Sequence, residues 1–349
     1  MKEIVMSVWD KLKSWFDQDG VHFISQPIPK AQVDVAYDDA QLVADRGYLR
    51  IWLVEMFLTK SRTWFQEWQP AVHGRIKLAF ADQSVEIVRL AAPSGDKFRA
   101  SKAVLSNYVL LDLVPFRGGT VEIEAGLLAL RGADRLGTAI SVVSGFADLV
   151  APPLAQALEI TSKVKDSITK LFGDTDEVHL GVHQTLGGTG GANPLRPGYV
   201  AMIRATDRDV ERGKLSVKND TLCDGKGAPL TGVDYMLLRI ETAANRDDFQ
   251  HFSDIAQLRK AAIEAYLTGD TAKGEALVAS AIAKIASHPD LINADRRALA
   301  KLVRDDIAEY KDGGHGAAPG DMRPWDQAVA AFAPVTDHAP VSVAELLAS

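Results

Sequence analysis

Cysteine is nearly absent from this chain, since Cys223 is the only one among 349 residues. A single cysteine cannot form an internal disulfide, so the fold must be held together by its core, which fits a reducing compartment. Asp224 follows Cys223 directly, and a neighbouring carboxylate raises the pKa of a thiol rather than lowering it. We therefore expect no catalytic role for this cysteine.

Long uncharged hydrophobic runs are also missing. The N-terminal segment carries charges at Glu3, Asp10, Lys11 and Lys13, so it lacks the uncharged core of a signal peptide. A membrane-spanning helix needs about 20 predominantly apolar residues. The longest apolar region, 137–158, is interrupted by an aspartate and a pair of prolines. These absences predict a cytoplasmic protein, and they make a membrane-embedded one an unfavoured alternative.

The chain has no run of basic residues with interleaved aromatics, and acidic residues outnumber basic ones, 46 to 39. The formal net charge is −7. Proteins that bind nucleic acid non-specifically rely on lysine and arginine to neutralise phosphates. We therefore expect no nucleic-acid partner.

Short apolar or alternating segments separated by turn residues dominate the first half of the chain. Such segments are typical of antiparallel strands in a sandwich or barrel. The predicted strands are 33–37, 48–58, 74–81, 85–90, 107–114 and 120–130, followed later by 178–185, 198–205, 214–218 and 235–242. The short polar link between 74–81 and 85–90 predicts a hairpin.

Helical spacing of apolar residues replaces the strand pattern in three places. One is an N-terminal amphipathic helix in 1–20, and another is an insertion at about 135–172. The third is 251–311, where two helices form a hairpin joined at Gly269 and a third helix starts near Asn293. Ser253 is expected to cap the first of these helices.

These patterns predict an α+β fold. An antiparallel β-sandwich-like domain over 21–250 contains the inserted amphipathic helical segment, and the C-terminal α-helical hairpin follows it. Two sequential domains are the alternative. The tail, 312–349, is rich in glycine, alanine and proline, and we expect Trp325 and Phe332 to hold it against the rest of the protein.

Aromatic residues in polar surroundings are the best candidates for contact with a partner. Trp64, Phe65 and Trp68 lie in a polar link between two predicted strands, and Trp9 and Trp15 lie in the N-terminal helix. Large aromatic side chains dominate interface energetics when they fill partner pockets. The competing interpretation is that the link folds back as a lid over the core.

A metal site has weak support. His179 and His183 are four residues apart in a predicted strand and should share one face, with Asp174 and Asp176 nearby. However, the sequence contains no paired metal-ligand motif such as HExxH or CxxC. We therefore expect no metal, and these four residues are kept only as the alternative.

No motif identifies an enzyme or a cofactor. The glycine-rich stretch 187–191 follows a strand, but Pro194 and Pro197 leave no helix N-terminus to bind a phosphate. No GxSxG motif is present. We therefore predict a non-enzymatic protein–protein interaction module, an adaptor or structural subunit of a larger intracellular assembly or a self-associating chain, without cofactor. The alternatives are a hydrolase with an unrecognised active site and a membrane-binding module that uses the inserted helices.

Overall fold

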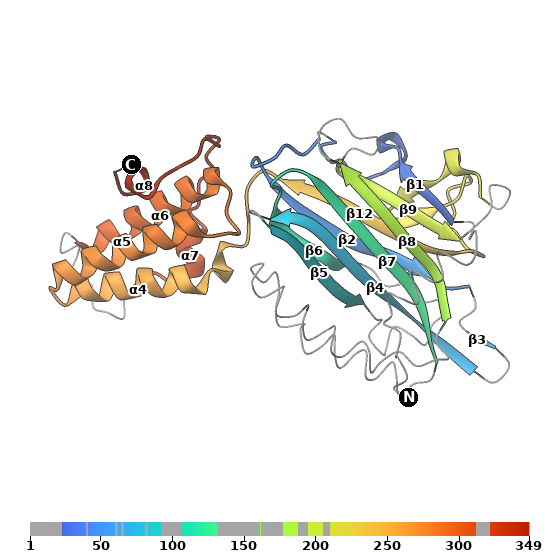
Figure 1. Cartoon of the computed structure of the whole chain (residues 1–349), viewed down its shortest axis with the longest axis horizontal. Coiled ribbons are helices and arrows are strands. Elements are labelled where there is room, and N and C mark those ends of the chain that lie inside the picture. The colour runs from blue at the N-terminus through green and yellow to red at the C-terminus, as the bar shows by residue number, and fades with distance from the viewer. Residues whose placement is uncertain are drawn as a thin grey trace.

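The computed structural model describes residues 23–39, 41–59, 62–63, 66–80, 83–91, 107–131, 161, 177–187, 195–204, 210–311 and 322–348. Two antiparallel β-sheets lie face to face, and a group of helices adjoins one end of them (Figure 1). This arrangement confirms the predicted α+β class with a sandwich-like β-structure.

The first sheet has five strands, and the strand that comes last in the sequence lies in the middle. Their spatial order is β1 (Phe23–Ile28), β9 (Gly198–Arg204), β12 (Asp234–Ala243), β2 (Tyr48–Phe57) and β6 (Tyr108–Pro115). Strand β12 pairs with β9 on one side and with β2 on the other. Most of β2 is buried, as its nearly continuous apolar sequence predicts.

The second sheet contains the predicted hairpin. Its spatial order is β5 (Gln83–Ala91), β4 (Gln66–Phe80), β7 (Thr120–Arg131) and β8 (Glu177–Gly187), with β3 (Arg62–Thr63) paired to the start of β4. Pairing of β4 with β5 continues up to Phe80 and Gln83. The hairpin is therefore confirmed, although β4 begins eight residues earlier than the sequence pattern suggested.

The main hydrophobic core lies between the two sheets. Alternate residues of each strand point inward, because side chains in a strand alternate between its two faces. Leu53 and Met236 from the first sheet and Ile76 and Ile123 from the second are at most 1% exposed. Burying an aliphatic side chain of this size contributes about 1.5–3 kcal/mol, so this core is the main stabilising feature of the sandwich.

A small hairpin covers part of the outer face of the first sheet. It consists of β10 (Ser216–Lys218) and β11 (Thr221–Cys223). The two turn residues, Asn219 and Asp220, both have positive φ, as a two-residue hairpin turn of type I′ requires. Val217 and Leu222 are buried against the sheet.

The predicted strand 33–37 is wrong. Only Val33 forms a β-bridge, to Val217, and the residues after it form a loop. The backbone N–H of Asp34 donates to the Val217 carbonyl, and the Asp34 carboxylate accepts from the Asn219 N–H. Apolar and polar residues do alternate over 33–37. However, the neighbouring hairpin β10–β11 pairs with this segment at Val33 only, and no strand forms.

The C-terminal helices pack around a core of their own. They are α4 (Ser253–Leu267), α5 (Thr271–Ser287), α6 (Asn293–Lys311), α7 (Trp325–Val329) and α8 (Val343–Ala348). Asp270 caps α5 by accepting from the Lys273 N–H. The expected Ser253 cap is wrong, because Ser253 is already the first helical residue and Phe252 precedes it without a side-chain cap.

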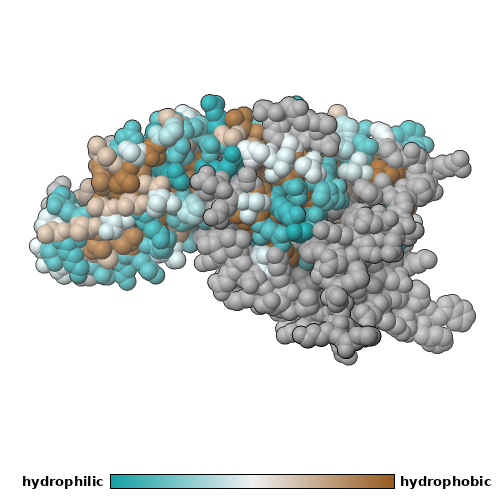
Figure 2. All heavy atoms as spheres, in the orientation of Figure 1, coloured by the Kyte–Doolittle hydropathy of each residue, from teal (hydrophilic) through white to brown (hydrophobic). Residues whose placement is uncertain are grey.

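The tail residues Trp325 and Phe332 lie against the helices, as predicted. Trp325 Nε1 donates to the Phe249 carbonyl at 3.0 Å, and the rings of Phe332 and Phe249 are 4.3 Å apart. On the face shown in Figure 2, hydrophobic patches lie amid hydrophilic residues on the surface of the helical part. Val343 and Leu347 of α8 are among the large hydrophobic residues that stay exposed.

A buried polar cluster joins the sandwich to the helices, and we call it the joint: Tyr48, Arg246, Asp248, Asp290, Ile292 and Asp295. The Tyr48 hydroxyl donates to Asp295 Oδ2 at 2.5 Å and accepts from the Ile292 N–H at 3.0 Å. Arg246 binds both carboxylate oxygens of Asp248, at 2.7 and 2.6 Å. Its Nη1 also donates to the carbonyls of Leu113 and Asp290.

Two predicted helical regions lie largely outside the described residues, namely 1–20 and the insertion at about 135–172. The exception is Thr161, which is helical and buried. Its Oγ1 accepts from the Val88 N–H of β5 at 3.1 Å. Among the described residues, no helix has the length and apolar character needed to cross a membrane.

Candidate functional site

A groove of about 310 Å³ opens on the outer face of the first sheet, beside the part that hairpin β10–β11 covers. We call it the groove throughout. Its lining comes from four places: residues 35–38 of the loop after β1, Arg50 of β2 with Leu113 of β6, residues 197–199 at the start of β9, and residues 239–243 of β12. The joint lies next to the end of the groove formed by Ala243, which packs against Tyr48. Binding sites are common at such junctions between packed units.

Loop residue Tyr37 forms one wall of the groove. Its ring lies edge-on to that of Tyr199, at 6.5 Å between centroids, and Lys30 lies over it at 5.5 Å. Gly198 has a φ of 142°, and a Cβ at that position would come within 3.1 Å of the Tyr37 hydroxyl oxygen. Glycine at 198 therefore lets the loop approach β9 closely.

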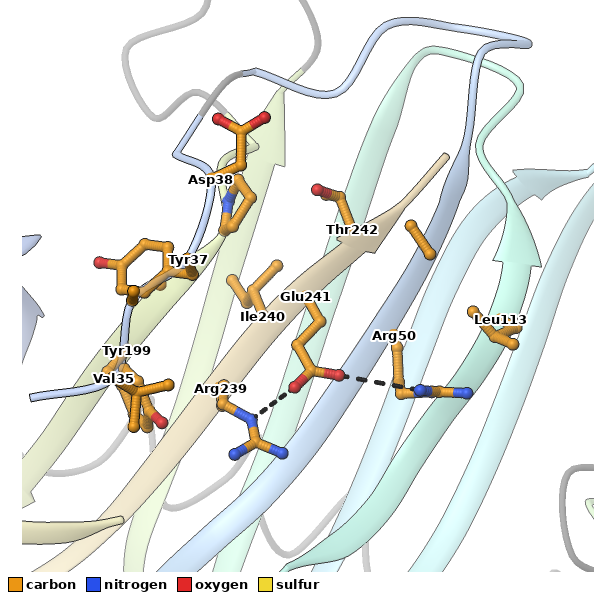
Figure 3. Close-up of a pocket in the computed structure, with 14 residues that line it drawn as sticks. Val35, Tyr37, Asp38, Arg50, Leu113, Tyr199, Arg239, Ile240, Glu241 and Thr242 are labelled. Atoms are coloured by element: carbon orange, nitrogen blue, oxygen red, sulfur yellow. Dashed lines mark ion pairs between the residues drawn. The ribbon is translucent and has the colours of Figure 1, made fainter. Parts of the chain in front are cut away.

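Polar residues from two neighbouring strands make the floor of the groove. Arg239 is paired in register with Trp52, and Glu241 with Arg50. Residues two apart in a strand share a face, so these four side chains lie together on the outer face. Figure 3 shows the Glu241 carboxylate between the two guanidinium groups, with the loop residues Val35 and Tyr37 across the groove.

Carboxylates hold both floor arginines in place. Arg239 Nε lies 2.9 Å from Glu241 Oε1, and Arg50 Nη1 lies 3.9 Å from Glu241 Oε2. Arg50 Nε also donates to Asp112 at 2.5 Å. The Glu241 carboxylate accepts from Trp52 Nε1 at 2.7 Å. The two guanidinium carbons lie 5.6 and 5.1 Å from the Trp52 ring centroid, within the range of cation–π attraction.

Tyr199 and Asp220 extend this network toward hairpin β10–β11. The Tyr199 hydroxyl donates to Asp220 Oδ1 at 2.5 Å, and Arg239 Nη1 reaches the same oxygen at 3.1 Å. Burial, together with the hydrogen bond to Asp220, raises the pKa of Tyr199 to about 12. The phenol therefore stays protonated near neutral pH, and it serves as a hydrogen-bonding group rather than as a base.

Among the charged residues that line the groove, the carboxylates are more accessible than the arginines. The side chains of Glu241 and Asp247 are 37% and 78% exposed, whereas those of Arg50 and Arg239 are 21% and 19% exposed. Asp38 on the rim is also exposed. The arginines of the groove are therefore less exposed than its carboxylates, and each is paired with carboxylates.

Most of the aromatic residues predicted to contact a partner lie outside the described residues: Trp9, Trp15, Trp64 and Phe65. Trp68 of β4 is placed only by its backbone, which pairs with that of Arg131 in β7. The segment interpreted as a polar link is thus partly strand, because β3 and β4 occupy 62–63 and 66–80.

The structure places one of the four alternative metal-site residues in a polar cluster. His183 Nδ1 lies 3.1 Å from Glu124 Oε1 of β7. Asp174, Asp176 and the side chain of His179 lie outside the described part of the chain. The pairing of β7 with β8 shifts register between Leu127 and Leu128, opposite His179, so simple alternation does not fix which face that histidine takes.

Cys223 is buried at the end of β11. Burial raises the pKa of its thiol, and the charges of Glu55 and Asp224 act in the same direction. The thiolate is the reactive form of cysteine, so this environment disfavours a nucleophilic role.

The sequence interpretation overlooked Arg50, Trp52, Arg239 and Glu241. Their signal is visible in hindsight, because charged residues interrupt two otherwise apolar strand segments, YLRIWL and MLLRIETA. A buried strand accepts a charge only where its side chain finds partners or solvent. Each interruption thus marks the outer face of β2 or β12.

Comparison with protein-family models, curated proteins and solved structures found no match for this chain.

Proposed function

We propose that this chain is a non-enzymatic protein-binding module, an adaptor or structural subunit of a larger intracellular assembly, and that the groove accepts a basic segment of its protein partner. The observation that carries the proposal is the distribution of charge in the groove. Asp38 and Asp247 are exposed and Glu241 is partly exposed, whereas the arginines of the groove are less exposed and are paired with carboxylates. Complementary charge guides association and selects partners.

The lining of the groove favours recognition over the alternative of hydrolysis. Among its described lining residues, none is a serine, cysteine or histidine. The carboxylate of Glu241 is engaged by Trp52 and Arg239, and the Tyr199 phenol is held protonated. Groups that are paired in this way orient a ligand, whereas a general base or nucleophile needs a proton-transfer partner and a lone pair directed at the substrate.

A partner with a lysine or arginine side chain fits this surface. Such a side chain has an apolar stem and a charged end. The stem would lie along Val35 and Tyr37, and the charge would meet Glu241 and Asp247. Electrostatic attraction of this kind weakens with salt, because the Debye length is about 8 Å at physiological ionic strength.

Two matched variants test the proposal with a defined probe. Val35 and Val43 are 45% and 47% exposed, but only Val35 lines the groove. We expect Val35→Lys to repel a fluorescent lysine- and arginine-rich peptide and to lower its affinity at least about tenfold, a change of about 1.4 kcal/mol. Val43→Lys adds the same charge outside the groove, and we expect it to bind like the wild type.

The same variants then serve as baits in cell extract. A protein that is retained by the wild type and by Val43→Lys, but not by Val35→Lys, would identify the partner. Equal loss of the peptide in both variants would reduce the effect to net charge. The proposal would be contradicted if both variants bound the basic peptide as tightly as the wild type does. It would also be contradicted if the wild type bound a glutamate-rich control peptide as tightly as the basic one.

Trp9, Trp15, Trp64, Phe65 and Trp68 stay predicted partner contacts. Aromatic anchors cost about 2 kcal/mol or more of binding when truncated. We expect Trp64→Ala and Trp68→Ala to reduce partner retention without changing the melting temperature. A lower melting temperature with full retention would instead make these residues part of the core.

A further inference from the structure

A second cluster of chemically capable side chains lies on the outer face of the second sheet, away from the groove. Glu122 and Glu124 are two apart in β7 and share a face. His183 of β8 is paired in register with Glu124. The potential ligand atoms of these three residues all lie within 4.8 Å of one another. We propose that Glu122, Glu124 and His183 bind a divalent transition-metal ion, with Zn²⁺ the best fit.

The spacing of the donor atoms supports this assignment. His183 Nδ1 and Glu124 Oε1 are 3.1 Å apart. Zinc binds nitrogen and oxygen ligands at about 2.0–2.2 Å, so two ligands of one tetrahedral ion are about 3.3 Å apart. The first two donors already have nearly this separation. Glu122 lies at the surface, where rotation of its side chain brings the third oxygen into place.

Arg75 orients the central ligand. Its Nη1 donates to Glu124 Oε2 at 2.9 Å, and its Nη2 donates to Glu86 at 2.5 Å. The arginine therefore occupies the Glu124 oxygen that does not face His183. A hydrogen bond to the outer oxygen of a ligating carboxylate is the usual way in which proteins fix such ligands.

The charges nearby leave room for a dication. Lys77 lies 3.4 Å from Glu122, and the two side chains are 32% and 36% exposed, so water can reach this contact and weaken it. Among the described residues of this cluster, three carboxylates, Glu86, Glu122 and Glu124, pair with two cations, Arg75 and Lys77. A bound ion would therefore neutralise an excess negative charge, and water would complete its coordination on the exposed side of His183.

The donor set selects among metals. One imidazole with two carboxylates suits zinc or a neighbouring transition metal, whereas Mg²⁺ and Ca²⁺ favour all-oxygen sites. Binding requires the neutral imidazole, so affinity must fall in acid. This inference does not depend on the proposed partner groove.

Isothermal titration of the full chain with ZnCl₂ tests the site. We expect one ion per chain with micromolar affinity, little heat with MgCl₂, and at least about tenfold weaker zinc binding in His183→Ala and in Glu122→Gln. His251→Ala, which removes a partly buried histidine on a different element, should bind zinc like the wild type. Melting temperatures should be unchanged in all three variants, because none of the three side chains is buried.

Two results would overturn the proposal. One is the lack of zinc binding up to about 1 mM at neutral pH. The other is binding that His183→Ala and Glu122→Gln leave unchanged, which would reduce the cluster to a ladder of ion pairs across strands β5, β4, β7 and β8.

Discussion

Two arginine clusters in this protein share one chemistry and differ in their access to water. In the joint, Arg246 lies over the rings of Tyr48 and Phe252, at 5.3 Å from each, and pairs with Asp248. In the groove, Arg50 and Arg239 lie over Trp52 and pair with carboxylates. The Arg246 side chain is only 2% exposed.

This difference in solvation decides what each cluster can do. A buried charge costs several kcal/mol to desolvate, so it must keep every partner. The joint therefore acts as a fixed connection between the sandwich and the helices. The pairs of the groove are partly solvated, so breaking one costs less than breaking a buried pair, and a ligand can replace one of their members more readily. The ion pairs of the groove are thus suited to ligand binding, and those of the joint to a fixed connection.

Removal of Arg246 should give the largest effect. We expect Arg246→Leu to lower the free energy of unfolding by about 3–5 kcal/mol, because Asp248 would stay buried without its cation. Urea denaturation measures the loss. The double variant Arg246→Leu, Asp248→Leu should recover part of it, since no unpaired charge remains. A loss below about 1 kcal/mol in the single variant would show that the joint is no more demanding than the groove.

The joint should also respond to pH through Asp295. Burial raises the pKa of this carboxyl from 3.8 to about 6, and its Oδ1 is buried with no hydrogen-bond partner among the described residues. The folded state therefore binds this proton more tightly than the unfolded state does. The resulting stabilisation is fully present below about pH 4 and is lost as pH rises through 6, by on the order of 3 kcal/mol.

His288 acts in the opposite direction over an overlapping range. Burial lowers its pKa from 6.5 to about 4, so its contribution to stability is lost as pH falls. Comparison with Asp295→Asn separates the two effects. We expect the advantage of the wild type over Asp295→Asn to shrink between pH 4 and pH 7. A difference that stays constant with pH would contradict the assignment.

Loss of an arginine should destabilise the protein less in the groove than in the joint. We expect Arg239→Gln to change the free energy of unfolding by about 1 kcal/mol or less, since its ion pairs with Asp220 and Glu241 are partly solvated. The same variant removes a positive charge from beneath the exposed carboxylates and should tighten binding of a basic peptide. Destabilisation comparable to that of Arg246→Leu would remove the distinction between the two clusters.

Local patterns in the sequence predicted the elements well, because alternation and helical spacing follow from which faces are buried. Strands such as β2 and β7 and helices α4 to α6 were found on that basis. The pattern failed at 33–37, where alternation is present but no pairing edge is available. Whether a segment forms a strand also depends on a neighbouring strand that can pair with it, and the segment's own sequence does not show whether one is available.

Neither the groove nor the joint could be found in this way. Trp52 and Glu241 are 189 residues apart, and Tyr48 and Asp295 are 247 apart. Only the register of β2 against β12 brings the first pair together. The outer face of a strand and its charged residues were readable from the sequence, but the identity of the facing strand was not.

The central position of β12 in the first sheet has a consequence for synthesis on the ribosome. Without residues 234–243 the sheet consists of two separate pairs, β1 with β9 and β2 with β6, because β12 alone connects them. The flank of β2 that β12 will cover stays open while residues 58–233 are made, and the flank of β9 while 205–233 are made. Such long-range closures are slow and prone to aggregation. Nascent chains that end before 234 should therefore need chaperone protection that the complete chain does not.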